Sequence, residues 1–319
     1  MELPPPLRAG VDQILRDTPI ADIRKAAETL SQRYRGEIRD GRLHLNERAA
    51  ATAYLATRLP ATYAAIRASL SSVADIRPDW APRTLLDAGA GPGTMLWAAR
   101  DQWPSIGEAT MVEASEAMIQ VGDALARESG ARATWIAADI ARGLPTLERA
   151  DLVTLSYVLG ELAPAAIDPL IERLWELSAD VLLVVEPGTP AGWQRILELR
   201  DRLIALGAHI LAPCPHAERC PLAAPDWCHF SRRVARSRTH RLAKDADVPW
   251  EDEKFIYLAA SRTPNDNPSA RVLARPRVSS GAVRLKLCSP AGQMEERLVT
   301  KRQGDDYKVA RRLDWGDRL

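Results

Sequence analysis

Cysteine is sparse in this chain, and three of its four copies lie in one short segment. Cys214, Cys220 and Cys228 occur within "PCPHAERCPLAAPDWCHFSRR", and Cys288 follows 60 positions later in "VRLKLCSP". Prolines directly after two of these cysteines stiffen the loop, and the segment is too polar and too rich in proline for a buried core. The four thiols are therefore candidate ligands of a closed metal site, either a 4Fe–4S cluster or a structural zinc ion.

The spacing of the cysteines excludes three common metal-binding motifs. Five and then seven residues separate the first three cysteines. These intervals match neither the close pairs of zinc fingers nor the tight run of bacterial ferredoxins. They also differ from the cysteine triplet of radical S-adenosylmethionine enzymes. His216 and His229 lie in the same segment and are alternative ligands, or loop residues that face RNA.

A second chemical motif is the glycine-rich stretch "LLDAGAGPGT". It contains Asp87, Gly89, Gly91 and Gly93 between a short apolar run and a helical pattern. Glycines at such a turn let the backbone approach a ligand closely. The third glycine of a dinucleotide-binding motif is missing, because Thr94 occupies its position.

Two further acids follow at the ends of the next two predicted strands. Glu113 is placed to accept hydrogen bonds from ribose hydroxyls, and Asp139 to accept one from an adenine amino group. The acid followed by G-x-G-x-G resembles motif I of class I S-adenosylmethionine-dependent methyltransferases. By this resemblance, Asp87 and the three glycines line the methionine end of the cofactor, Glu113 its ribose and Asp139 its adenine.

The catalytic side of such a site is less defined. The fourth predicted strand runs into "LSYVLGELAP", which has neither the Asn/Asp-Pro-Pro-Tyr motif of amino-methylating enzymes nor a cysteine nucleophile. Tyr157 and Glu161 are candidates for hydrogen bonds to a substrate, or ordinary loop residues. Methyl transfer from a sulfonium can proceed by proximity alone. Both an enzyme and a binding-only protein are compatible with this loop.

Positive charge is concentrated near the cysteines. The stretch "SRRVARSRTHRLAK" contains no acid, and residues 229–319 hold 20 Lys/Arg against 12 Asp/Glu, a net charge of +8. The spacing predicts several basic residues on one helical face, suited to phosphate contacts; a solvated basic face is the alternative. The RNA-binding candidates are Arg232, Arg233, Arg236, Arg238, Arg241 and Lys244.

The elements that must position these residues follow from apolar periodicity. Residues 1–80 show the three-to-four spacing of helices, and short apolar runs then alternate with helical patterns up to residue 262. This alternation predicts an α/β fold with a doubly wound parallel sheet. We expect three segments: an N-terminal helical region (1–80), a cofactor-binding domain (81–262) with a cysteine- and arginine-rich insertion (about 210–245), and a small β extension (263–319).

Composition places the chain among ordinary globular proteins. It has 319 residues, of which 46% are hydrophobic and 27% charged. No apolar run reaches the roughly 18–20 residues of a membrane span, and "MELPPPLRAGVDQILRD" lacks the features of a secretory signal. We therefore expect a cytoplasmic protein, in which thiols stay reduced and structural disulfides are rare.

Several stretches together resemble a known family. "APCPHAERCPL", "DWCHFSRR", "LCSPAG" and "LDWGD" are similar to segments of methyltransferase-like assembly factors of the mitochondrial small ribosomal subunit and their bacterial relatives (Rsm-type). The resemblance covers nearly the whole chain. It implies that Cys214, Cys220, Cys228 and Cys288 ligate a 4Fe–4S cluster, and that the protein acts in small-subunit assembly and rRNA methylation.

The sequence thus predicts a protein with a class I methyltransferase fold that binds S-adenosylmethionine, a structural 4Fe–4S cluster and small-subunit rRNA. No membrane or DNA partner is expected. The alternatives are a non-catalytic rRNA-binding assembly factor with the same fold, and a small-molecule methyltransferase with a structural zinc site.

Overall fold

The computed structural model describes residues 1–36, 47–265 and 268–319, and the chain forms two compact units. The first unit comprises residues 1–185 and 232–253, and the second comprises residues 186–231 and 254–319. The chain passes from one unit to the other within strands, at residues 185–186, 231–232 and 253–254. Part of the predicted helical region (37–46) and two residues of the predicted β extension (266–267) lie outside the described residues.

The first unit contains a parallel sheet with strand order β3-β2-β1-β4-β5. On the central strands β1 and β4, most side chains are buried, as expected where helices cover both faces of a sheet. The order reverses between β1 and β4, which is the arrangement of a doubly wound fold. The predicted α/β fold of the class I methyltransferase type is therefore confirmed. The strands are β1 (Thr84–Ala88), β2 (Glu108–Glu113), β3 (Arg132–Ala137), β4 (Ala150–Ser156) and β5 (Ser178–Pro187).

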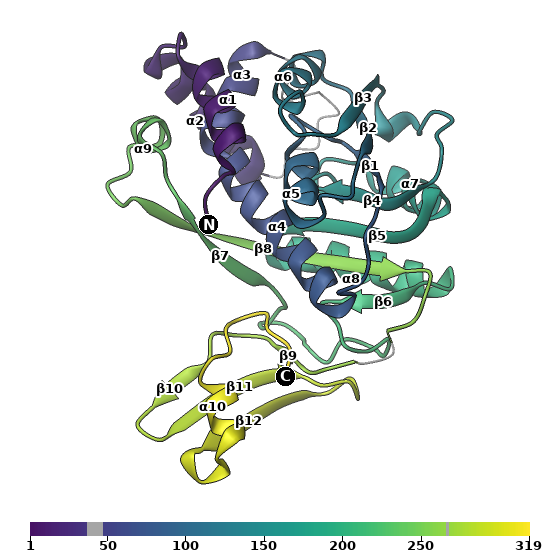
Figure 1. The fold of residues 1–319 in the computed structure, drawn as a ribbon, viewed down its shortest axis with the longest axis vertical. Coiled ribbons are helices and arrows are strands. Elements are labelled where there is room, and N and C mark those ends of the chain that lie inside the picture. Colours follow the sequence, from purple (N-terminus) through teal and green to yellow (C-terminus); the bar gives the residue numbers. More distant parts are fainter. Residues whose placement is uncertain (37–46, 266–267) are drawn as a thin grey trace. The chain divides into compact units, whose positions relative to one another are not determined.

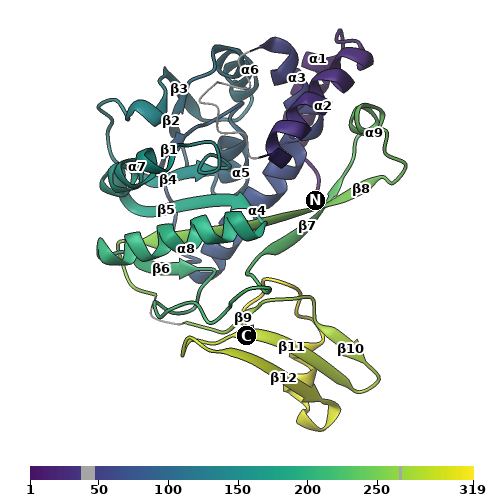
Figure 2. The same ribbon diagram turned by 180° about the vertical axis from the view of Figure 1, so that it is seen from behind.

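Helices cover both faces of this sheet. Helices α4 and α5 lie on the face turned towards the viewer in Figure 1, and α7 lies on the face seen in Figure 2. Alanine-rich α4 is buried along most of its length, because small side chains permit close helix packing. The helices of this unit, apart from α9, are α1 (Pro5–Leu15), α2 (Ile20–Gly36), α3 (Arg48–Thr57), α4 (Leu59–Ile76), α5 (Thr94–Gln102), α6 (Glu116–Ala126), α7 (Pro164–Leu177) and a short 3₁₀ helix (Ile140–Arg142).

The arginine-rich stretch forms an extended arm rather than one helix. Strand β7 (Phe230–Ala235) pairs with β8 (Trp250–Ser261), and only α9 (Arg238–Lys244) between them is helical. Ser237 caps α9 by accepting a hydrogen bond from the His240 amide. The prediction of a single basic helical face is therefore wrong: alternation of buried and more exposed residues in "FSRRVA" is the pattern of a strand.

The second unit combines a helix, two antiparallel strands and a separate small sheet. Helix α8 (Pro190–Ala205) precedes β6 (His209–Ala212), which runs antiparallel to β8. The small antiparallel sheet, in yellow-green tones in Figure 1, packs Val283, Leu285 and Leu287 against α10. Its elements are β9 (Arg271–Val272), β10 (Arg277–Ser279), β11 (Ala282–Cys288), β12 (Met294–Thr300), a 3₁₀ helix (Lys301–Gln303) and α10 (Asp305–Ala310).

Gly281 and Gly292 are in left-handed conformations at the turns of this small sheet. Strand β6 and helix α10 were not predicted, because each is too short to show periodicity. Across the part of the chain that the structure describes, no helix is both long and apolar enough to cross a membrane.

Candidate cofactor site and candidate metal centre

The glycine loop turns sharply between β1 and α5. The amides of Gly89 and Ala90 both donate to the Val112 carbonyl, at 2.8 and 3.0 Å, which ties the loop to β2. Gly89, Gly91 and Gly93 all have positive φ, and Gly93 is the N-cap of α5. A Cβ at Gly89 would lie 2.6 Å from Val158 Cγ2, whereas one at Gly91 would meet no atom within 4 Å. Gly91 therefore faces the open space in which a ligand can approach the backbone.

Asp87 is buried beneath this loop. It accepts a hydrogen bond of 2.7 Å from the Thr154 hydroxyl on β4. Burial raises the pKa of Asp87 to about 7, and the nearby Glu113 adds to the increase, while the bond from Thr154 opposes it. A carboxylate in this state gains from a cationic ligand, because opposite charge favours its ionised form.

The other two predicted cofactor acids lie at the carboxyl ends of the neighbouring strands. Glu113 ends β2 and accepts hydrogen bonds from the amides of Gly91 (2.7 Å) and Ser115 (2.8 Å). Burial raises its pKa, and these amide bonds oppose the increase. Asp139 lies two residues beyond β3, where it accepts a 3.0 Å bond from the Ala141 amide. The structure thus places all six predicted cofactor positions at the carboxyl ends of β1, β2 and β3.

Tyr157, one of the two predicted catalytic candidates, lies in a buried hydrogen-bond network. Its φ is +61°, which is strained for a residue with a bulky side chain. Its hydroxyl donates a 3.0 Å hydrogen bond to Glu253, which also forms a 3.5 Å ion pair with Arg58. Burial and Glu253 hold the pKa of Tyr157 well above its usual value. The side chain of Glu161 is exposed.

Arg58 and Glu253 were not found from the sequence. They lie about 100 residues before and after Tyr157, and neither belongs to a recognisable motif. Only the packing of α4 and the arm within the first unit brings them to the loop after β4.

In the second unit, all four cysteines line one cavity. Cys214, Cys220 and Cys228 come from the segment between β6 and β7, and Cys288 ends β11. Cys288 is buried, and the other three are partly buried. Apolar side chains from α8 and β8, including Trp193, Ile196 and Ile256, line the same cavity. The structure therefore brings the predicted metal ligands together from two distant stretches of sequence.

The thiols influence one another. Burial raises the pKa of Cys214, raises that of Cys228 well above its usual value, and raises that of Cys288 to about 12. For Cys228 and Cys288 the other thiols contribute further, since neighbouring negative charges disfavour each other. Among the described residues, no group of three or more His, Cys, Asp or Glu side chains is arranged to hold a single metal ion.

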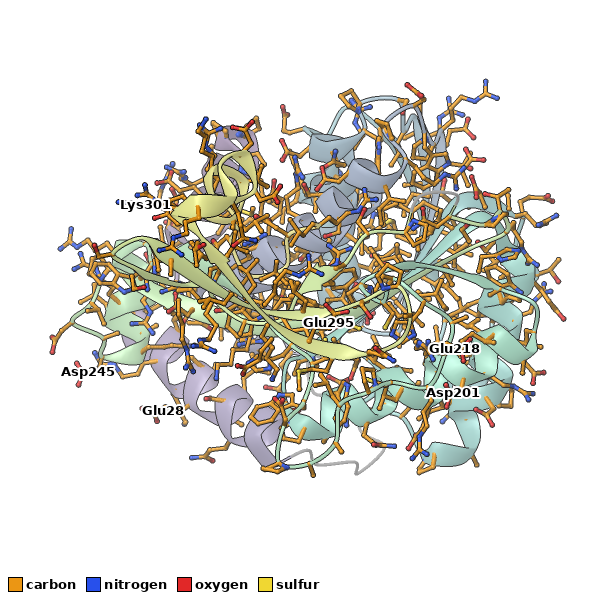
Figure 3. The ribbon with its side chains drawn as sticks, turned by 90° about the horizontal axis from the view of Figure 1, so that it is seen from below. Glu28, Asp201, Glu218, Asp245, Glu295 and Lys301 are labelled. Atoms are coloured by element: carbon orange, nitrogen blue, oxygen red, sulfur yellow. The ribbon has the colours of Figure 1, made fainter. Side chains whose placement is uncertain are left out.

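The two candidate histidines have different environments. His216 Nδ1 lies 3.1 Å from the Glu218 carbonyl, and its Nε2 lies 3.3 Å from Cys288 Sγ. Because a carbonyl only accepts, Nδ1 carries the proton and Nε2 faces the thiol. His229 instead stacks on Trp227, with ring centroids 4.9 Å apart, and meets Trp315 edge-on. Glu218, labelled in Figure 3, lies on the loop between the first two cysteines.

Two buried arginines also line the cysteine cavity, and sequence reasoning missed both. Arg200 on α8 is 1% exposed and Arg271 on β9 is 4% exposed. Arg200 donates to the carbonyls of His216 and Glu218, and Arg271 donates to that of Pro213. Arg200 is part of an amphipathic helix in which arginine ordinarily faces solvent, so no local signal separated it from exposed neighbours.

The predicted RNA-binding residues fall into two groups. Arg236 and Lys244 form ion pairs with Glu251, at 3.1 and 3.8 Å, and Arg233 forms a bidentate pair with Asp252. Burial acts to raise the pKa of Glu251, but His240, Lys244 and Arg236 outweigh it and lower the pKa to about 2. In contrast, Arg238 and Arg241 on α9 are exposed and form no ion pair with another described residue, and Arg232 is partly exposed.

Comparison with known proteins identifies the family of this chain. The family described as "Mitochondrial small ribosomal subunit Rsm22" matches residues 48–319. The chain belongs to the Rsm22 family. This confirms the resemblance seen in the cysteine-containing and C-terminal motifs, and the match includes all the predicted cofactor and metal positions.

Relatives of this Rsm22-family chain include the human mitochondrial ribosome assembly protein METTL17, which is 30% identical over 83% of this chain and 61% of its own length. The mitochondrial Rsm22-cox11 tandem proteins 1 and 2 of Schizosaccharomyces pombe are 22% identical over 83% of this chain and 42% of their length. The chain therefore spans about half the length of the curated relatives it matches.

Solved structures with a similar fold include magnesium protoporphyrin IX methyltransferase (ChlM) from Synechocystis PCC 6803 with bound SAM. It has a TM-score of 0.42 and 16% identity, over 74% of this chain and 92% of that chain. TehB from Haemophilus influenzae has a TM-score of 0.40 and 12% identity, over 60% of this chain and 62% of that chain.

Proposed function

We propose that this protein is an assembly factor of the small ribosomal subunit that binds S-adenosylmethionine, rRNA and a 4Fe–4S cluster, and that methylates rRNA. One observation supports this proposal most directly: in a member of the Rsm22 family, all four cysteines of the chain line one cavity. A relative named as a ribosome assembly protein is consistent with the same role.

S-adenosylmethionine binding is supported by the chemistry of the glycine loop. The cofactor carries a cationic ammonium group and a cationic sulfonium. Asp87 is a buried carboxylate with no described cation as its partner, and burial, with the nearby Glu113, raises its pKa to about 7. Glu113 lies beside the open approach to Gly91, where a ribose would present its hydroxyls.

We favour a 4Fe–4S cluster over a single zinc ion because the cysteine-containing motifs resemble those of the Rsm-type family, in which such a cluster is implied. The four described thiols line one cavity, as either metal site requires. A 4Fe–4S cluster is a larger body, and Cys214, Cys220, Cys228 and Cys288 would hold it through their sulfur atoms.

The decisive experiment is anaerobic purification followed by metal analysis. We expect a brown protein with about four iron and four sulfide per chain. We also expect the loaded protein, but not a cluster-free Cys214→Ser protein, to co-sediment with the small ribosomal subunit. A colourless, zinc-containing protein without RNA affinity would instead support a small-molecule methyltransferase with a structural zinc site.

A second candidate function is a non-catalytic assembly factor, and the loop after β4 favours it. The Tyr157 hydroxyl already donates to Glu253, so this candidate substrate contact is occupied by the protein's own carboxylate. Asp139→Ala distinguishes the two functions. If subunit maturation survives complete loss of cofactor binding in this variant, the fold serves as a scaffold; if maturation fails, the cofactor is required.

The relatives are mitochondrial by name, whereas we predict a cytoplasmic location for this chain. Fractionation of cells that express the native protein tests this prediction.

A further inference from the structure

The walls of the cysteine cavity contain two cations without a matching anion. Arg200 and Arg271 are almost fully buried, and none of the described residues that line the cavity with them is an aspartate or glutamate. The only described carboxylate paired with Arg200 is Asp201, at 3.4 Å, whose side chain is 77% exposed at the surface (Figure 3). Arg271 forms no ion pair with any residue the structure describes, and donates instead to the carbonyls of Pro213 and Gly316.

Two buried cations of this kind are costly in the metal-free protein. A buried charge without a counter-ion destabilises the folded protein, because hydrogen bonds to neutral carbonyls only partly replace the hydration that the charge loses. The described lining of the cavity offers no carboxylate to offset the two guanidinium groups. In addition, the Nε atom of Arg200 is buried and has no hydrogen-bond partner. The cavity is therefore built for an anionic occupant.

The cysteines supply that anionic character when they bind metal. Metal ligation requires thiolates. Four thiolates around a core of charge +2 leave a net charge of about −2, which two arginines balance. We propose that Arg200 and Arg271 are the charge partners of an anionic tetrathiolate centre and determine its retention and reduction potential. This inference rests on the proposed metal-binding function.

The same arginines also shape the ligand loop. Arg200 donates to two carbonyls between Cys214 and Cys220, and Arg271 donates to the carbonyl of the residue before Cys214. Substitution could therefore act through loop shape alone. Charge and shape are separated by comparing Arg271→Lys, which keeps the charge but loses the two-pronged donor, with Arg271→Gln, which loses the charge.

The experiment uses the full-length loaded protein and the variants Arg271→Gln, Arg271→Lys and Arg200→Gln. Arg284→Gln is the control, because Arg284 lies on the same small sheet with its side chain 52% exposed.

Iron release to a chelator and the midpoint potential are measured. We expect release at least tenfold faster in both Gln variants. Their potential should fall, because a cation favours the more negative reduced cluster, by about 59 mV per tenfold change in the redox equilibrium. Arg271→Lys should keep a near-normal potential, and Arg284→Gln should match the wild type.

Urea unfolding of loaded and metal-free protein gives a second readout. If the arginines act through charge, Arg271→Gln destabilises the loaded form more than the metal-free form. Equal destabilisation of both forms, or unchanged potential and iron release in a loaded Gln variant, would overturn the inference. If the wild type holds zinc instead, the proposed cluster fails, but faster zinc loss from the Gln variants would still support the charge role. A wild-type protein that binds neither metal would refute both.

Discussion

The two candidate sites differ in how far the protein satisfies its own polar groups. In the first unit, the hydroxyl of Thr154 serves Asp87, and backbone amides serve Glu113 and Asp139. In the second unit, four thiols surround a cavity walled by two buried arginines that lack a buried counter-ion. The acids of the cofactor site are hydrogen-bonded without a ligand, and only Asp87 is fully buried without a described cation. The cysteine site instead holds two buried cations without a described buried anion.

Because of this difference, we expect the two ligands to contribute unequally to the stability of the fold. A site whose groups are already paired can lose its ligand with little change in structure. A site with unbalanced buried charge depends on its ligand, since binding and local folding are then coupled. We therefore expect metal loss to alter the second unit far more than cofactor loss alters the first.

The largest expected effect is that of Cys288→Ser. Structural metal binding is worth on the order of 10 kcal/mol in small metal-dependent domains, and Cys288 joins β11 to the cysteine segment around the cavity. We expect loss of the metal and rapid amide hydrogen exchange at Cys214–Cys228 and in β11, with normal protection of β1 and β4. Slow exchange throughout the second unit of the metal-free variant would contradict the proposed dependence.

The reciprocal change is Gly89→Ala in the first unit. Its positive φ and the 2.6 Å approach of a Cβ to Val158 predict destabilisation of about 2–5 kcal/mol, with loss of S-adenosylmethionine binding and retention of iron. Gly91→Ala is the matched control for stability alone, because it has positive φ but open space around the new Cβ. Calorimetric titration and urea unfolding measure both effects. Recovery of stability by Val158→Ala in the Gly89→Ala protein would identify the clash as the cause.

The cofactor site was more predictable than the cysteine environment, for a physical reason. Its residues lie at the ends of consecutive parallel strands, so apolar periodicity and glycines are enough to bring Asp87, Glu113 and Asp139 to one edge. The cysteines were recognised as a set, but the burial of Arg200 and Arg271 depends on contacts between segments far apart in sequence. No periodic pattern marks such contacts.

The arginine-rich arm shows how spacing alone misleads. Intervals of two to four residues fit a helix, but the structure assigns Arg232 and Arg233 to β7, where they follow a strand pattern. The ion pairs of Glu251 and Asp252 were equally invisible, because β8 pairs with β7 only after the chain turns back at α9.

Asp87→Asn tests whether the cofactor site carries an unmet need for a cation. The native pKa of about 7 exceeds the ordinary 3.8, so the folded state keeps a proton that the unfolded state loses. The stability contribution of this group is therefore full below pH 4 and declines as pH rises towards 7, by at most about 4 kcal/mol. In the Asp87→Asn variant, this decline of stability with pH should vanish. Urea unfolding from pH 4 to 8 measures it. Asp123→Asn, on the exposed face of α6, is the control and should leave the decline in place.

For the wild type, the same titration predicts that S-adenosylmethionine binds more tightly as pH rises from 6 to 8, because the ionised Asp87 attracts a cationic ligand. A pH-independent affinity together with a pH-independent stability would show that Asp87 is ionised throughout this range, which would remove the basis of the predicted need.

The smallest expected effect concerns the same contrast between paired and unpaired charge within the arm. Arg238 and Arg241 are exposed, whereas Arg236 is paired with Glu251. Unpaired arginines are available to phosphates, so the double substitution Arg238→Gln and Arg241→Gln should weaken binding to a small-subunit rRNA fragment about tenfold. It should also lower the slope of log affinity against log salt by roughly 0.7–0.9 per lost contact.

Arg236→Gln should leave that slope unchanged and reduce stability instead, because it removes an ion pair of a partly buried carboxylate. Fluorescence anisotropy across a potassium chloride series distinguishes these outcomes, and a slope that falls for Arg236→Gln but not for the double variant would reverse the assignment.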